Sequence, residues 1–152
     1  MATTRTTRHV DASRAAVYRA LLDPQAIATW RVPAGMSSQV HEFDAREGGS
    51  FRISLTYDAP TESGKTTALT DTFHGHFVKL VPNEQVVEVL EFESESPELR
   101  GRMTMTTTLV DADGGTEVLV VHEGIPGGVS TDDNETGTRM ALANLAALVE
   151  KG

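Results

Sequence analysis

The chain has 152 residues, of which 39% are hydrophobic, and a formal net charge of -9. This size and apolar content suffice for one core, so we expect residues 1–152 to form a single domain. The negative charge repels phosphate groups, which argues against nucleic acid and anionic membranes as partners. The chain has no cysteine, and its N-terminus has no apolar signal segment. We therefore expect a cytoplasmic protein without disulfides or thiolate sites.

The N-terminal part of the sequence predicts one strand and two helices. The β-branched stretch 3–10 predicts the strand, and apolar residues at helical spacing follow it. Either Asp11 or Ser13 is suited to cap the first helix. The second helix is expected to begin at Pro24, where the missing N–H is tolerated, and to end at Trp30.

The middle of the sequence predicts strands joined by turns. Apolar and polar residues alternate over 51–57, which is typical of a strand with one buried face. The stretch 59–66 is rich in Pro, Gly and Ser and predicts a loop at the rim of the domain. A two-residue loop at 82–83 would pair Phe77 with Glu88, on a face that is otherwise mostly apolar.

A second turn signal lies nearer the C-terminus. The Asp113-Gly114 dipeptide predicts a tight hairpin that pairs Met105 with His122. The connection before this hairpin contains no comparable signal, so its register is an alignment of hydrophobic residues. We align Leu90 with Met105, which places Glu88 diagonal to His122.

The C-terminal segment predicts one long amphipathic helix. It is expected to begin at Ser130 or Thr131, with two aspartates in its first turn, where negative charge is favourable. The apolar residues that recur at helical spacing form its buried stripe: Ala141, Leu142, Leu145, Leu148 and Val149.

Several local strings of the sequence resemble the START-like (SRPBCC) superfamily. The resemblance is closest to the family of homologues of the activator of the heat-shock chaperone ATPase. It implies an α+β helix-grip fold, in which a curved antiparallel sheet of six to seven strands wraps around a long C-terminal helix, with two short helices after the first strand. The strings that carry it span residues 8–30, 43–52, 74–93 and 114–126.

Two positions depart from the pattern of this family. Gly137 is followed by Thr138, where the relatives usually have tryptophan. Glu88 stands where the relatives commonly have an apolar or aromatic residue. The first change replaces an indole by a hydroxyl, and the second introduces a carboxylate on an inward face.

The fold that this resemblance implies favours a small-molecule binding module. We expect an apolar or amphipathic ligand to lie in a cavity between the C-terminal helix and the sheet, with no cofactor. The lining that we predict combines aromatic, aliphatic and a few polar side chains: Trp30, Phe51, Ile53, Tyr57, Phe73, Phe77, Glu88, Leu90, Phe92, Met105, His122, Thr138, Leu142 and Leu145.

Glu88 and His122 are the candidate polar anchor of that cavity. A buried carboxylate needs a partner, and His122 is the nearest inward ionisable group in the predicted register. If the two side chains touch, each stabilises the charged form of the other, which would raise the pKa of His122. The same pair would supply an acid and a base to an alternative function, cyclase-, dehydratase- or hydrolase-like chemistry. A structural histidine beside a snorkelling glutamate is the simpler interpretation.

A second histidine pair carries less functional weight. His74 and His76 share one face of a predicted strand, with Glu91 opposite His74, a pattern that resembles a two-histidine, one-carboxylate metal site. Val89 rather than a ligand opposes His76, and this face should be wet. We therefore interpret the pair as solvated and predict no metal.

A third alternative is a co-chaperone or other protein-interaction role on the outer surface. The sequence offers no exposed apolar stripe to support it. The oligomeric state is left open, and a homodimer is one arrangement that the sequence allows.

Overall fold

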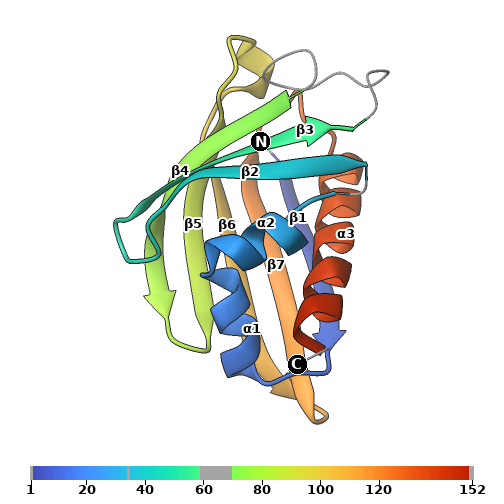
Figure 1. Cartoon of the computed structure of the whole chain (residues 1–152). Coiled ribbons are helices and arrows are strands. Elements are labelled where there is room, and N and C mark those ends of the chain that lie inside the picture. The colour runs from blue at the N-terminus through green and yellow to red at the C-terminus, as the bar shows by residue number, and fades with distance from the viewer. Residues whose placement is uncertain (1, 34, 59–69, 151–152) are drawn as a thin grey trace.

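The computed structural model describes residues 2–33, 35–58 and 70–150, so the predicted loop at 59–66 lies outside the described residues. Seven antiparallel strands form one curved sheet in the order β1-β7-β6-β5-β4-β3-β2, which confirms the predicted α+β helix-grip fold. In Figure 1, helix α3 lies along the inner side of the sheet, and α1 and α2 cross its opening. The elements are β1 (Ala2–Val10), α1 (Arg14–Leu21), α2 (Pro24–Trp30), β2 (Met36–Phe43), β3 (Ser50–Tyr57), β4 (Thr70–Val81), β5 (Gln85–Phe92), a short 3-10 helix η1 (Pro97–Leu99), β6 (Met103–Ala112), β7 (Gly115–Ile125) and α3 (Thr131–Glu150).

The two short helices begin at capped positions. The Ser13 hydroxyl accepts a hydrogen bond from the backbone N–H of Ala16 at 3.1 Å, so Ser13 rather than Asp11 caps α1. Asp23 caps α2 in the same way, with Pro24 in its first turn. The indole N–H of Trp30 then donates to the carbonyl of Ala20 at 2.9 Å, and this bond ties the end of α2 to α1.

The register of β4 and β5 is as predicted, although the turn between them is not. Phe77 lies opposite Glu88, and the other predicted pairs on these strands are also observed. The turn spans residues 82–84 instead of two residues, with Asn83 at a φ of 63°. A register shift between Phe77 and Lys79 compensates for the extra residue, so the same pairs meet.

The registers on the two sides of β6 show how much a turn signal contributes. The pairing of Met105 with His122 is confirmed, because the Asp113-Gly114 dipeptide adopts positive φ at both residues and closes a tight hairpin. The alignment of Leu90 with Met105 is wrong, since Met105 pairs with Glu88 instead. Both alternatives keep the same residues on the inner face, so hydrophobic pattern alone does not separate them.

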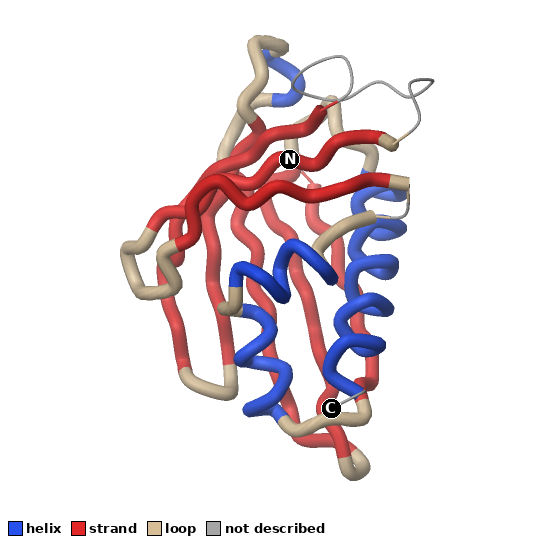
Figure 2. The backbone as a smooth tube through the Cα atoms, in the orientation of Figure 1, coloured by secondary structure: helices blue, strands red, loops and turns tan. Residues whose placement is uncertain are grey.

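Figure 2 shows that β2, β3 and the first part of β4 cross over the remaining strands, which gives the sheet its strong curl. Helix α3 packs mainly against β1 and α2 inside this curl. Its fully buried residues are Leu142, Leu145 and Ala146, and the rest of the predicted stripe is half-buried. None of the described helices combines the length and the apolar character that crossing a membrane requires.

Candidate functional site

The interior of the fold contains a buried ion pair. Arg31, the residue directly after α2, donates from Nη1 to Oε1 of Glu88 on β5 at 2.9 Å. The two side chains are only 12% and 5% exposed. The partner of Glu88 is therefore Arg31, which was not among the residues predicted from the sequence. A lone arginine at the end of a helix is usually solvated, so nothing in the sequence singled it out.

Aromatic rings and a thioether surround the guanidinium of Arg31. Its central carbon lies 5.9 Å from the ring centroid of Phe51 and 5.4 Å from that of Phe73. Nη2 lies 3.3 Å from the sulfur of Met105. Cation–π attraction at these distances favours the charged guanidinium in a position where little water reaches it.

His122 lies on the same inner face, one strand beyond Met105. Met105 pairs with Glu88 on one side and with His122 on the other, so β6 separates the two ionisable residues. Among the described residues, Nδ1 of His122 is buried without any hydrogen-bond partner. Burial, and then the positive charge of Arg31, lower the pKa of His122 to about 4, so the ring is neutral at pH 7.

The raised pKa that contact with Glu88 would give His122 is therefore not found. The Glu88 carboxylate binds Arg31, and the pKa of His122 is lowered instead of raised. Arg31, Glu88 and His122 are called the interior cluster below. As a pair, Glu88 and His122 lack the direct hydrogen bond that acid–base chemistry between them requires.

On the other side of His122, a residue of β1 links the sheet to helix α3. Thr4 pairs with His122, and its hydroxyl donates to the side-chain oxygen of Asn134 in α3. Thr138 is half-buried, and its hydroxyl donates to the backbone carbonyl of Asn134 at 2.8 Å. The hydroxyl of Thr138 is thus satisfied within its own helix.

Asn144 of α3 holds the segment that carries Arg31. Its side-chain N–H group donates to the carbonyl of Val32 at 2.9 Å and to that of Trp30 at 3.4 Å, the two residues that flank Arg31. An open pocket of about 370 Å³ lies next to this contact. It is lined by Thr29, Val32, Pro33, Gly35, Met36, Asn144, Ala147 and Leu148.

Most of the predicted cavity lining is packed in the core. Among these residues only Tyr57, Phe92 and Thr138 are half-buried, and the others are buried. The apolar members apart from Tyr57 belong to one core cluster or pack against it. The structure thus brings the apolar members other than Tyr57 together, and Glu88 and His122 lie on the same inner face.

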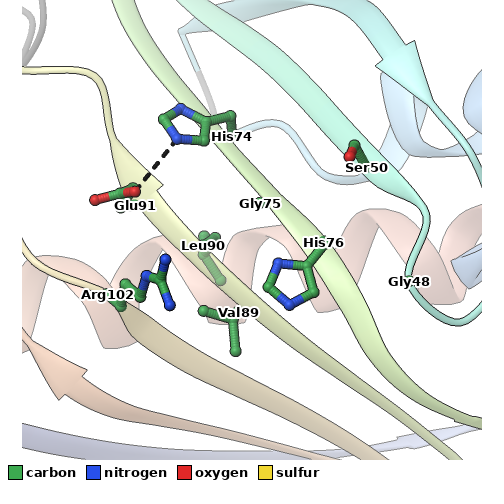
Figure 3. Close-up of a pocket in the computed structure, with 9 residues that line it drawn as sticks. All are labelled: Gly48, Ser50, His74, Gly75, His76, Val89, Leu90, Glu91 and Arg102. Atoms are coloured by element: carbon green, nitrogen blue, oxygen red, sulfur yellow. Dashed lines mark ion pairs between the residues drawn. The ribbon is translucent and has the colours of Figure 1, made fainter.

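A second open pocket, of about 320 Å³, lies on the outer face of the sheet over β4 and β5. Figure 3 shows His74 turned toward Glu91, His76 beyond Gly75 on the same strand, and Arg102 on the side of Glu91. Nε2 of His74 lies 3.3 Å from Glu91, and His76 pairs with Val89 as predicted. Within the described part of the chain, no group of three His, Cys, Asp or Glu residues is arranged to hold a metal ion.

Beside this pocket, Arg52, His74 and Glu93 form a group called the outer cluster below. Arg52 donates from Nε and Nη2 to the two carboxylate oxygens of Glu93, at 2.8 and 2.9 Å. Nδ1 of His74 lies 3.0 Å from the same carboxylate. The hydrogen bond from Arg52 is the largest cause that lowers the pKa of Glu93, to about 2.

Comparison with known proteins places this fold in a family. The family model described as Activator of Hsp90 ATPase homolog 1-like protein matches residues 11–150. The chain belongs to this family. The resemblance seen in the sequence is thereby confirmed. The matched region includes both the segment of Arg31 and the whole of α3.

Solved structures of relatives share the complete fold. A crystal structure of a protein from Chromobacterium violaceum is 33% identical, with a TM-score of 0.86 and coverage of 99% of both chains. A protein from Rhodobacter sphaeroides is 18% identical, with a TM-score of 0.80 over 98% of this chain and 92% of that one. One from Arthrobacter aurescens is 15% identical, with a TM-score of 0.79 over 99% and 87%. The last two show the fold alone. No functionally curated protein matches the sequence.

Proposed function

We propose that this family member binds a small amphipathic molecule between α3 and the inner face of the sheet. The polar group of the ligand would lie at the interior cluster, and its apolar part among the surrounding core side chains. The observation that carries the proposal is the unpartnered Nδ1 of His122 beside the buried pair of Arg31 and Glu88.

An unsatisfied buried polar atom lowers the stability of a protein by about 1 to 3 kcal/mol. An apolar residue at position 122 would avoid this cost. Such a residue would suit this face of β7, since its neighbouring buried positions are Val118 and Val120. A buried ion pair is also often replaceable by apolar side chains without loss of stability. Polar groups that a core does not need for stability support a binding role.

The pocket beside Asn144 supports a route to this site. It lies between α3 and the segment from α2 to β2, directly beside the backbone that carries Arg31. Val32, Met36 and Leu148 supply apolar walls. An amphipathic molecule that loosens the contact of Asn144 with this segment would reach the interior cluster from this side.

A protein-interaction role has less support from the described surface. The large hydrophobic residues that are most exposed there are Val78, Val110 and Met140, on β4, β6 and α3. Docking sites usually present one contiguous apolar patch, whereas these residues come from three different elements. The co-chaperone alternative therefore remains secondary to ligand binding.

The proposal can be tested by NMR titration with octanoic acid and octanamide, which share one apolar chain. We expect at least one probe to give saturable shifts at the backbone amide of Arg31, the ring of His122 and the amides of α3. Thr138→Trp, which adds bulk at a half-buried position of α3, should weaken binding about tenfold or more. Met140→Trp is the matched control, because Met140 is 38% exposed on the same helix, and it should bind like the unmodified protein.

Two results would count against ligand binding in the interior. In one, neither probe gives saturable shifts. In the other, the shifts are confined to the outer pocket, at residues such as His76 and Arg102.

A further inference from the structure

Resting on the proposed function, we infer that the polar group of the ligand is a carboxylic acid and that it is bound together with one proton. The inference comes from the geometry and charge balance of the interior cluster. It specifies the class of ligand and predicts that binding depends on pH.

The interior cluster is electrically balanced. Arg31 and Glu88 form a pair at 2.9 Å in which both side chains are nearly buried, so their charges cancel within the interior. A carboxylate added to this pair would leave one net negative charge where water has little access. Such a charge is strongly disfavoured unless a proton accompanies it.

His122 is the residue that can hold this proton. Arg31 approaches it from the end of α2, Glu88 lies two strands away on β5, and Asp71 shares the inner face of β4 farther along the sheet. The residues paired with His122, Thr4 on β1 and Met105 on β6, carry no titratable group, and neither does Asn134, the α3 partner of Thr4. A carboxylate beside the ring would become the nearest negative charge to Nδ1.

The charges around the ring favour an acid over other polar groups. The charge of Arg31 contributes to holding the pKa of His122 low, so the ring lies in positive potential although Glu88 is near. A cationic ligand would be repelled there. A carboxylate would take hydrogen bonds from Arg31 and would favour the protonated ring, giving an alternating series of Glu88, Arg31, ligand and His122.

A neutral acid would satisfy the same groups. Its carbonyl oxygen accepts from Arg31, while its O–H donates to the neutral ring nitrogen of His122. In either case the complex contains one proton more than the separated protein and carboxylate at pH 7. Proton uptake therefore distinguishes a carboxylic acid from an amide of the same shape.

Calorimetry with octanoic acid and octanamide tests this inference. Titrations at pH 7 in two buffers of different ionisation enthalpy report the protons taken up on binding. We expect about one proton for octanoic acid and none for octanamide. Between pH 8 and pH 6 the affinity for the acid should rise by up to about tenfold per pH unit, while the affinity for the amide stays constant.

A variant pair identifies the residue involved. His122→Asn keeps a polar amide near the position of Nδ1 but does not titrate in this range, and it should weaken octanoic acid about tenfold more than octanamide. His76→Asn, on the exposed outer face, is the matched control and should change neither affinity. If His122→Asn fails to fold, the proton count of the unmodified protein decides.

The results separate the two proposals. Binding of octanoic acid without proton uptake, or tighter binding of octanamide at pH 6, would overturn the carboxylic acid inference and leave the interior binding site in place. Equal weakening of both probes by His122→Asn would overturn the assignment of the proton to His122. Absence of binding by both probes would contradict the proposed function itself.

Discussion

The interior cluster and the outer cluster are built from the same three residue types, an arginine, a glutamate and a histidine. In the interior the arginine and glutamate side chains are 12% and 5% exposed, whereas outside they are 44% and 30% exposed. The inner carboxylate receives one hydrogen bond from its arginine, and the outer one receives two together with a contact from His74. Geometry therefore favours the outer pair, although the inner pair is more deeply buried.

The two clusters affect the stability of the fold in opposite ways. Outside, hydrogen bonding dominates and lowers the pKa of Glu93 to about 2, which stabilises the folded state at neutral pH. Inside, desolvation dominates and lowers the pKa of His122 to about 4, which destabilises the folded state in mild acid. The exposed Glu93 thus supports the folded state, whereas the buried His122 lowers its stability in acid.

Removing one member of each ion pair should separate the clusters most clearly. Glu88→Ala leaves Arg31 charged and buried without its partner, and we expect a loss of about 3 to 5 kcal/mol in the free energy of unfolding. Glu93→Ala removes a partly exposed carboxylate and should cost about 1 kcal/mol or less. Urea denaturation at pH 7 measures both.

The double substitution Arg31→Met with Glu88→Leu controls for this effect. It removes both charges and keeps the site filled, so it should recover most of the stability lost in Glu88→Ala. Similar losses in Glu88→Ala and Glu93→Ala would show that the inner pair is as hydrated as the outer one.

A buried residue of α3, the helix over the interior cluster, should contribute almost as much to the free energy of unfolding. Leu145 is fully buried in the middle of α3, and Leu145→Ala is expected to destabilise the fold by about 2 to 5 kcal/mol, since the curved sheet cannot easily collapse into the gap. Leu148→Ala, at a half-buried position one turn later, should cost clearly less. Thermal melting compares the two, and an unchanged midpoint for Leu145→Ala would mean that α3 is not firmly docked.

Local signals in the sequence account for most of the fold. The Asp113-Gly114 dipeptide determines one hairpin, and the caps at Ser13 and Asp23 determine where the short helices begin. The pairing of Glu88 with Phe77 was predicted from a two-residue loop. The loop has three residues, and the bulge in β4 offsets the additional one, so the pairing is the same. Before β6 the chain passes through η1 without a tight turn, and there the predicted register was wrong.

The site was harder to predict because its members meet only in three dimensions. Glu88 was recognised as a carboxylate in need of a partner, but the partner was sought along the sheet, at His122. Arg31 follows a short helix and is 57 residues distant in sequence from Glu88. Only the crossing of α2 over the sheet brings it there, and no periodic pattern in the sequence records that crossing. The one available signal was the unmet charge of Glu88 itself.

The pH dependence of stability should distinguish the buried His122 from the exposed His76. In the unfolded chain the pKa of His122 returns to about 6.5, so between pH 6.5 and pH 4 the unfolded state binds more protons than the folded state. Stability should therefore fall over this range as pH decreases, by up to about 3 kcal/mol from His122 alone. In His122→Asn this part of the loss should be absent.

Urea denaturation at pH 7, 5.5 and 4.5 measures this difference. His76→Asn, which changes an exposed histidine, should follow the unmodified protein at all three values. Parallel curves for His122→Asn and the unmodified protein would mean that His122 is protonated as easily in the folded chain as in the unfolded one.

The smallest expected effect concerns the outer cluster, and its sign is opposite. The folded pKa of Glu93 is about 2, below its ordinary value of 4.5, so its stabilising contribution is present above pH 4.5 and is lost as pH falls toward 2. Because the side chain is 30% exposed and screened by solvent, we expect Glu93→Gln to cost less than about 1 kcal/mol at pH 6. Glu91→Gln, which removes a single contact to His74 at 3.3 Å, is the control and should cost less still.

Measured at pH 6, 4 and 3, the difference in the free energy of unfolding between Glu93→Gln and the unmodified protein should shrink as the pH falls. A difference that grows instead would mean that the Glu93 carboxylate weakens the outer cluster, and the contrast between exposed and buried clusters would not hold.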